Sequence, residues 1–113
     1  MADKQYNVES IKGTITIPTS DTVTKGTAVL GEINGLTTTI FLTTPAMEDT
    51  DSTLMQIANS SDAVFFTSGT KAESATSVIG SQVAIVPGDK VVMTAEGTQS
   101  AARSIVYDIR ILR

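Results

Sequence analysis

Residues 101–113 read AARSIVYDIRILR, and this stretch decides the fold that we predict. From Ile105 to Ile111 its odd positions are apolar, whereas Asp108 and Arg110 lie at even positions. Because successive side chains of a β-strand point to opposite faces, this period of two places the isoleucines and Tyr107 on one face and the charges on the other. A helix would scatter them around its surface. The stretch therefore predicts a strand with one buried face and one solvated face.

The composition extends this prediction to the whole chain. Threonine occurs 18 times among the 113 residues, beside many valines and isoleucines. Side chains that branch at Cβ fit a pleated sheet better than a helix. A chain of this length has the usual size of one domain and can bury a core without cross-links. We therefore expect an all-β protein with a single domain at 10–113, preceded by an N-terminal arm at 1–9 that shows no periodicity.

Several classes of function are disfavoured by residues that are missing or dispersed. The sequence has no cysteine and no histidine, so it lacks disulfides, thiolate ligands, the commonest metal ligand and the commonest general base. The formal charge is −4 and the eight Lys and Arg residues are dispersed, which disfavours nucleic acid as a partner. No apolar run reaches the roughly 20 residues of a membrane helix, and MADKQYNVES contains no signal-peptide core. We expect a protein with no enzymatic activity, no cofactor and no membrane partner.

Turn residues divide the chain into about seven or eight short strands. The first is expected at 10–17, where Pro18 ends it. Residues 22–32 contain a weaker pattern that Lys25-Gly26 interrupts, so their register stays open. Residues 69–77 are expected to form a loop, with a helical turn at 71–77 as the alternative.

Three hairpins are predicted between these strands. Asn34-Gly35 is a strong turn signal that would join 28–33 to 36–44, the polar residues 59–62 would join 53–58 to 63–68, and Pro87-Gly88 would join 78–86 to 90–95. Of the adjacent Phe65 and Phe66, one is expected in the core and the other exposed or covered by a partner. Short strands at intervals of about 8 to 12 residues are typical of a two-sheet antiparallel β-sandwich, Ig-like or jelly-roll-like.

One acidic loop is a candidate metal site. Glu48, Asp49 and Asp51 lie close together in the turn-rich segment 45–52, and carboxylate oxygens are the ligands that calcium takes. Their spacing does not match an EF-hand loop, and a solvated loop that keeps a sheet edge soluble is the alternative. Paired carboxylates also hydrolyse glycosides, but a chain with no Trp, three Phe and two Tyr offers few aromatic walls for a sugar.

Two stretches carry a resemblance to known proteins. The run 44–74, TPAMEDTDSTLMQIANSSDAVFFTSGTKAES, and the run 86–113, VPGDKVVMTAEGTQSAARSIVYDIRILR, resemble small Thr-rich β-sandwich structural proteins of tailed bacteriophages, of the capsid decoration or cement type. What looks similar is the order of parts: a short hairpin, a polar loop, a turn at Pro87-Gly88-Asp89 and a final strand. The likeness covers about the C-terminal two thirds of the chain.

The resemblance implies a non-enzymatic virion protein that binds the outer head shell and stabilises it. Its partner would be the major capsid protein of the same virion, and it would act at the head surface after synthesis in the cytoplasm of the host bacterium. Decoration proteins of this kind often associate, so a homo-oligomer is expected, with a trimer favoured. The second interpretation is a phage tail or host-attachment module that binds carbohydrate, which exposed aromatic residues at loop tips would favour.

The arm supplies the expected partner-binding residues. An extended segment adds backbone hydrogen bonds at the sheet edge of a neighbour, whereas ordinary terminal disorder is the alternative. The residues expected to bind the partner are Lys4, Gln5, Tyr6, Asn7 and Val8.

Overall fold

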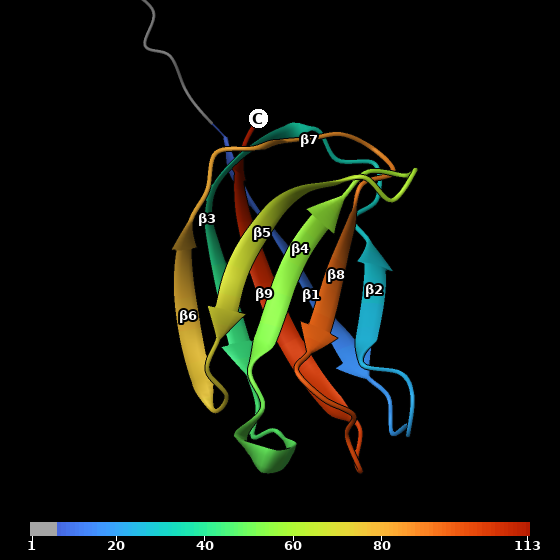
Figure 1. Cartoon of the computed structure of the whole chain (residues 1–113). Helices are drawn as coiled ribbons and strands as arrows, with labels where there is room; N and C mark the ends of the chain where they lie inside the picture. Colours follow the sequence, from blue (N-terminus) through green and yellow to red (C-terminus); the bar gives the residue numbers. More distant parts are fainter. Residues whose placement is uncertain (1–6) are drawn as a thin grey trace, which may run out of the picture.

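The computed structural model describes residues 7–113 and consists of two antiparallel sheets packed face to face (Figure 1). Its strands are β1 (Val8–Ile17), β2 (Lys25–Val29), β3 (Gly35–Thr44), β4 (Thr53–Ala58), β5 (Val64–Lys71), β6 (Ala75–Gly80), β7 (Ala84–Ile85), β8 (Lys90–Ala95) and β9 (Arg103–Leu112), with a 3-10 turn, η1 (Glu48–Thr50). One sheet has the order β1-β9-β3-β6, with β7 also paired to β3, and the other has the order β2-β8-β4-β5. The predicted all-β two-sheet sandwich is confirmed, and the two-residue β7 brings the described strands to nine.

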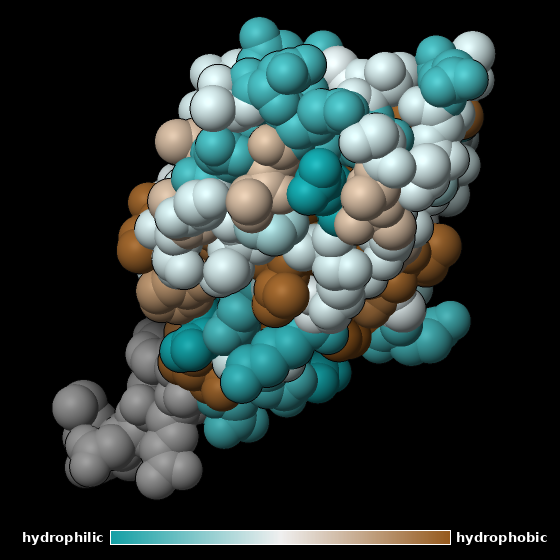
Figure 2. All heavy atoms as spheres, turned by 90° about the horizontal axis from the view of Figure 1, so that it is seen from below, coloured by the Kyte–Doolittle hydropathy of each residue, from teal (hydrophilic) through white to brown (hydrophobic). Residues whose placement is uncertain are grey.

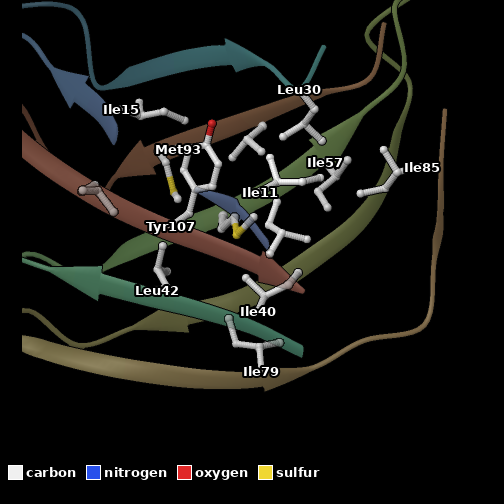
Figure 3. Close-up of a cluster of buried hydrophobic side chains, with 14 of the residues drawn as sticks. Ile11, Ile15, Leu30, Ile40, Leu42, Ile57, Ile79, Ile85, Met93 and Tyr107 are labelled. Atoms are coloured by element: carbon white, nitrogen blue, oxygen red, sulfur yellow. The ribbon is translucent and has the colours of Figure 1, made fainter. Parts of the chain in front are cut away.

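The C-terminal strand behaves as its periodicity predicts. In β9 the side chains of Ile105, Ile109 and Ile111 are fully buried, whereas Val106 on the opposite face is 44% exposed. Because β9 lies between β1 and β3, these isoleucines line the middle of the core, which Figure 3 shows in close-up. Burying one such side chain stabilises a fold by about 1.5 to 3 kcal/mol. This strand is therefore a main contributor to stability.

On one side of the sandwich a glycine allows β2 and β1 of the two sheets to approach closely. Gly26 of β2 lies against β1, where a Cβ would come within 2.7 Å of Ile15 Cγ2 and 2.8 Å of the Thr16 carbonyl oxygen. In the same region a Cβ at Gly13 would overlap the phenol ring of its cross-strand partner Tyr107. Burial raises the pKa of Tyr107. The Lys25-Gly26 pair thus begins a strand and permits a close approach between the sheets.

Two of the three predicted hairpins are wrong. Strand β2 pairs with β8 and strand β3 pairs with β9, β6 and β7, so the chain crosses between sheets where Asn34-Gly35 predicts a hairpin. Gly88 does turn, with φ of 94°, but β7 pairs with β3 and β8 with β2 and β4, so this turn also connects the two sheets. At Asn34-Gly35 the turn is also displaced, because Gly35 is already the first residue of β3 and the positive φ, of 90°, is at Gly31. Turn residues do not specify which strand pairs with which.

The remaining local predictions are confirmed or shifted by a few residues. Strands β4 and β5 form the predicted hairpin, in which Phe66 packs against the core and Phe65 is 40% exposed. Strand β1 begins at Val8 rather than at residue 10. The loop predicted at 69–77 is limited to 72–74, because β5 ends at Lys71 and β6 begins at Ala75, and no helical turn forms at 71–77. No helix among residues 7–113 is long and apolar enough to cross a membrane.

The loops gather at the two ends of the sandwich. In the orientation of Figure 1 the upper end holds the start of β1, the end of β9 and the loops 30–34, 59–63, 81–83 and 86–89. The lower end holds the loops 18–24, 45–52, 72–74 and 96–102. We call these regions the upper end and the lower end.

Candidate interaction surface

The lower end is acidic. Its four loops contain no Lys or Arg and six carboxylates, which are Asp21, Glu48, Asp49, Asp51, Glu73 and Glu96. Figure 2 views the molecule from this end, and hydrophilic and neutral residues make up most of the visible surface. Removing carboxylates from water is unfavourable unless a partner supplies matching donors or charges. A partner without such groups would therefore not cover this end.

Gln99 holds the lower end together through its buried side chain, which is 1% exposed. Its amide nitrogen donates to Asp51 Oδ2 at 2.9 Å and to the Gly97 carbonyl oxygen at 3.0 Å. Its amide oxygen accepts from the backbone N–H of Glu48 at 2.9 Å and from Arg103 Nε at 3.2 Å. One side chain thus ties η1, the 96–102 loop and the start of β9 to one another.

Two of the three calcium candidates, Glu48 and Asp51, take part in the hydrogen bonds around Gln99. The Glu48 carboxylate accepts from the backbone N–H of Ser100 at 2.8 Å, and the Asp51 carboxylate accepts from Gln99. Asp49 is exposed and has a left-handed backbone, with φ of 54°. Among residues 7–113 no group of three or more Asp, Glu, His or Cys side chains is arranged to hold a metal ion. Calcium binding stays a prediction for titration to test.

The upper end carries a row of exposed apolar side chains on the outer face of the five-stranded sheet. Val8 pairs with Leu112, and Leu112 pairs with Leu36. Val8 is 60% exposed, Leu36 is 42% exposed and Leu112 is half-buried. We call these three residues the Val8 row. Adjacent exposed apolar side chains are typical of a surface that a partner covers.

A glycine allows this row to form. At Gly35 a Cβ would lie 2.7 Å from the Leu112 carbonyl oxygen and 3.1 Å from Ile111 Cδ1, so a side chain would separate β3 from β9. Without one, Leu36 can pair with Leu112 at the very start of β3. The glycine that the sequence assigns to a turn therefore serves a close approach of two strands.

Four charged side chains of the upper end form two ion pairs, and neither pair lies on the face that carries the Val8 row. Arg113 Nη1 donates to both carboxylate oxygens of Glu9, at 3.0 and 3.1 Å, and the backbone N–H of Arg113 donates to the Asn7 carbonyl oxygen at 3.0 Å. Lys90 forms an ion pair with Asp62, and the hydrogen bond from Lys90 lowers the pKa of the Asp62 carboxyl. The upper end is therefore less acidic in character than the lower end.

Of the five predicted partner-binding residues, the structure describes Asn7 and Val8. Val8 belongs to the row, and Asn7 is exposed and accepts a hydrogen bond from Arg113. Lys4, Gln5 and Tyr6 lie outside the described residues, so the prediction for them is not tested.

The middle of the same sheet face is occupied by a polar and aromatic cluster. The Arg110 guanidinium donates to the Asp108 carboxylate at 3.0 to 3.2 Å and lies 5.1 Å from the centre of the Phe41 ring. The hydrogen bond lowers the pKa of Asp108 and raises the pKa of Arg110. Because the guanidinium covers the half-buried ring, this part of the face is less apolar than the Val8 row.

Two hollows lie on the outer face of the four-stranded sheet. The larger, of about 390 Å³, is lined in part by Lys25, Gln56 and Lys90, and the smaller, of about 260 Å³, is lined in part by Leu54 and Glu96. Neither is lined by an aromatic residue. Small-molecule sites usually have apolar and aromatic walls with a few convergent polar groups. The Val8 row is therefore the better candidate surface.

Sequence reasoning missed both Gln99 and the contribution of Leu36 to the row. Gln99 lies in a polar turn whose local sequence gives no sign that its side chain is buried. Leu36 and Ile40 have the same parity in β3, so strict alternation would bury both. The pairing of β3 with β9 shifts between Thr37 and Thr39, and this irregularity turns Leu36 outward. The threonine run offered no signal that would locate the shift.

Comparisons with known proteins identify a fold and no family. No protein-family model and no curated protein matches this chain. A chain of the solved structure "Cyanophage Pam1 capsid asymmetric unit" is similar with a TM-score of 0.58 and 16% identity, and the match covers 99% of this chain and 91% of that one. A chain of the structure "CBM4 structure and function" matches with a TM-score of 0.44 and 9% identity over 88% of this chain and 81% of that one, which supports no inference. The first likeness shows that a chain of a phage capsid asymmetric unit shares this sandwich fold.

Proposed function

We propose that this protein is a non-enzymatic structural component of a phage particle, a decoration or cement protein that binds the major capsid protein on the outer head shell and stabilises it. The observation that carries the proposal is the likeness to a chain of the Pam1 capsid asymmetric unit, which extends over almost the full length of both chains. The proposal agrees with the resemblance that the sequence carries at 44–74 and 86–113.

The charges of the two ends favour one orientation on the shell. Covering the lower end would desolvate six loop carboxylates, whereas covering the Val8 row removes apolar side chains from water. At the upper end Glu9 is paired with Arg113 and Asp62 with Lys90, so Glu32 is the exposed loop carboxylate left without an ion pair among the described residues. We therefore infer that the upper end faces the shell and that the lower end points into solvent.

Many weak contacts suffice for such a role. A head shell presents many copies of the same site, and an oligomer that engages several of them binds far more tightly than one copy does. The homo-oligomer that the resemblance implies would supply this gain.

The experiment is co-sedimentation of the purified protein with heads that lack it. The test variant is Leu36→Asp, and the control is Val23→Asp at the lower end, because the two side chains are 42% and 43% exposed and both changes add one negative charge. We expect the unaltered protein and Val23→Asp to pellet with heads and raise their melting temperature, and Leu36→Asp to bind at least tenfold more weakly. Melting of each free variant establishes that it is folded.

Each other result has a definite meaning. A folded Leu36→Asp that binds heads as well as the control would show that the Val8 row is not the contact surface. Failure of the unaltered protein to bind heads would remove the cement function. A tail or host-attachment module would then be the candidate, and tail proteins and glycans would be screened in the same assay.

A further inference from the structure

The two sides of the sandwich differ in how their strand edges are covered. Strands β1 and β6 are the edges of the five-stranded sheet, and β2 and β5 are the edges of the four-stranded sheet. On one side β2 lies against the lower half of β1, where Gly26 permits the close approach to Ile15 and Thr16. The other side is formed by β5 and β6. Exposed strand edges invite pairing with other chains, and most proteins protect them.

Strand β5 is protected by irregular pairing. Its register with β4 shifts twice, and Gly69 adopts a left-handed conformation with φ of 71° at one of these places. There the Ser68 hydroxyl accepts from the Met55 backbone N–H and donates to the Gly69 carbonyl oxygen. Lys71 ends the strand. Bulges and a terminal lysine are among the devices that prevent further pairing at a sheet edge.

Strand β6 has none of these devices. Its residues are ATSVIG, with no charge and no proline. It pairs in unbroken register with β3, from Thr44 opposite Ala75 to Thr39 opposite Gly80, and within residues 7–113 no strand pairs with its second edge. Val78 in its middle is 66% exposed. The edge is therefore regular, uncharged and ready to accept another strand.

We propose that the second edge of β6 binds residues 1–6 of a second copy of this chain as an added parallel strand. The donor segment leaves its own copy at the upper end, where β1 begins, and β6 ends at the upper end as well. Six extended residues span about 20 Å, which is also about the length of a six-residue strand such as β6. The donor carries one acidic and one basic side chain, Asp3 and Lys4, so its side chains bring no net charge to the uncharged edge.

Residues 1–6 are too short to reach and pair with β6 of their own copy. Strands β1 and β6 are opposite edges of one sheet, with β9 and β3 between them. A segment that crossed from β1 to a place beyond β6 would cover about four strand spacings, or about 19 Å, before it began to pair. Residues 1–6 would then be used in the crossing, with none left to lie along β6. Pairing is therefore expected between copies and not within one.

This inference extends the proposed function and rests on it for the orientation of the copies. Because donor and acceptor are different surfaces, the contact is heterologous, and such contacts close into rings when the rotation between copies permits. In a ring of this kind every copy has its upper end on the same side, as binding to a shell through the Val8 row requires. The trimer that the resemblance favours is one such ring.

The first test measures association without heads. Light scattering of the full chain is compared with a variant that lacks residues 2–6, and with a variant in which Asp3 and Lys4 are exchanged as a control of equal length and charge. We expect the full chain and the exchanged variant to form an oligomer and the shortened chain to associate at least tenfold more weakly. A monomeric full chain, or an unchanged mass after shortening, would overturn the proposal.

The second test locates the contact by cross-linking. Because the natural sequence has no cysteine, a disulfide can form only between introduced residues. Three proteins combine Val78→Cys with Asp3→Cys, Lys4→Cys or Gln5→Cys. In the matched controls Val29→Cys replaces Val78→Cys, because Val29 is 67% exposed on edge strand β2. We expect a covalent ladder of oligomers from one or more Val78 pairs and at least tenfold less from the matched Val29 pairs.

The outcomes separate this proposal from the proposed function. If every Val78 pair fails to cross-link more than its Val29 control, β6 is not the acceptor, whether or not the protein binds heads. If the ladder forms but heads are not bound, the exchange stands and the cement function falls. Association and head binding are thus read out independently.

Discussion

The lower end of the sandwich binds its loops together through one buried glutamine, whereas the upper end leaves a row of adjacent apolar side chains in solvent. At the lower end the buried amide of Gln99 makes hydrogen bonds to η1, to its own loop and to the start of β9. At the upper end Val8, Leu36 and Leu112 form an adjacent row to which no comparable network is attached among the described residues. The difference teaches that clustered polar residues here stabilise the fold, while the surface suited to a partner is apolar.

The largest expected effect is the loss of Gln99. Replacing Gln99 by Leu removes the amide nitrogen and the amide oxygen and leaves the Asp51 carboxylate and the Glu48 N–H without their partner. Each unsatisfied buried group costs about 1 to 3 kcal/mol, so we expect the free energy of unfolding to fall by about 3 kcal/mol in urea titrations.

Gln82→Leu is the matched control, because Gln82 is exposed in the upper-end loop 81–83. We expect it to change the free energy of unfolding by less than about 0.5 kcal/mol. Equal effects of the two substitutions would contradict the structural role of Gln99. Loss of head binding by folded Gln99→Leu would contradict the division of roles between the ends.

A smaller loss is expected from Asp89, the buried carboxylate of the upper end. Asp89 is 3% exposed, accepts from the Val86 backbone N–H at 2.9 Å, and its carbonyl oxygen accepts from Leu30 at 2.8 Å. Asp89→Ala would leave the Val86 N–H unpaired, and we expect a loss of about 1 to 2 kcal/mol in urea unfolding. Asp62→Ala is the control, because the Asp62 side chain is 78% exposed and surface ion pairs contribute little. A loss from Asp62→Ala as large as that from Asp89→Ala would show that both carboxylates stabilise the end equally.

The sequence predicted what depends on periodicity and failed where distant strands choose partners. The alternation of Ile105 to Ile111 predicted the inner face of β9, the composition predicted an all-β protein, and the spacing of short strands predicted the two-sheet sandwich. The pairing of β2 with β8 could not be predicted, because Asn34-Gly35 marks a change of direction without specifying whether the chain stays in one sheet. Adjacent strands in sequence pair often but not always.

The candidate surface was predicted in part. Val8 was predicted as a partner-binding residue of the aperiodic arm 1–9, and the structure shows it as the first residue of β1. Leu36 was hidden by a register shift at Thr37 and Thr39, and Gln99 by a turn whose polar residues look solvated. Both depend on contacts between segments far apart in the chain, which local patterns do not contain.

A third prediction concerns the polar cluster in the middle of the sheet face. The hydrogen bond from Arg110 lowers the pKa of Asp108 below its unfolded value, which is about 3.9. A carboxyl whose pKa is lowered on folding stabilises the fold above the unfolded pKa and loses this contribution as the pH falls through the folded pKa. We expect Asp108→Asn to reduce the loss of stability in acid by less than about 1 kcal/mol, because the pair is partly exposed.

Urea unfolding of the protein and of Asp108→Asn at pH 7 and at pH 3 measures this difference. Asp49→Asn is the control, since Asp49 is exposed at the lower end. A substitution at Asp108 that leaves the pH dependence unchanged, or that makes the protein more sensitive to acid, would contradict the assigned role of Arg110.

The smallest expected effect is that of calcium on the lower end. The Glu48 and Asp51 carboxylates already accept from Ser100 and Gln99, and Asp49 projects from a left-handed turn. A site with a dissociation constant of 1 mM would stabilise the fold by about 1.4 kcal/mol at 10 mM calcium, which corresponds to several degrees in melting temperature. We expect a shift of less than about 1 °C, with 10 mM magnesium as the control for ionic strength. A calcium shift of several degrees that Asp51→Asn removes would show that the acidic loops rearrange around a cation, and the lower end would then be a binding site as well.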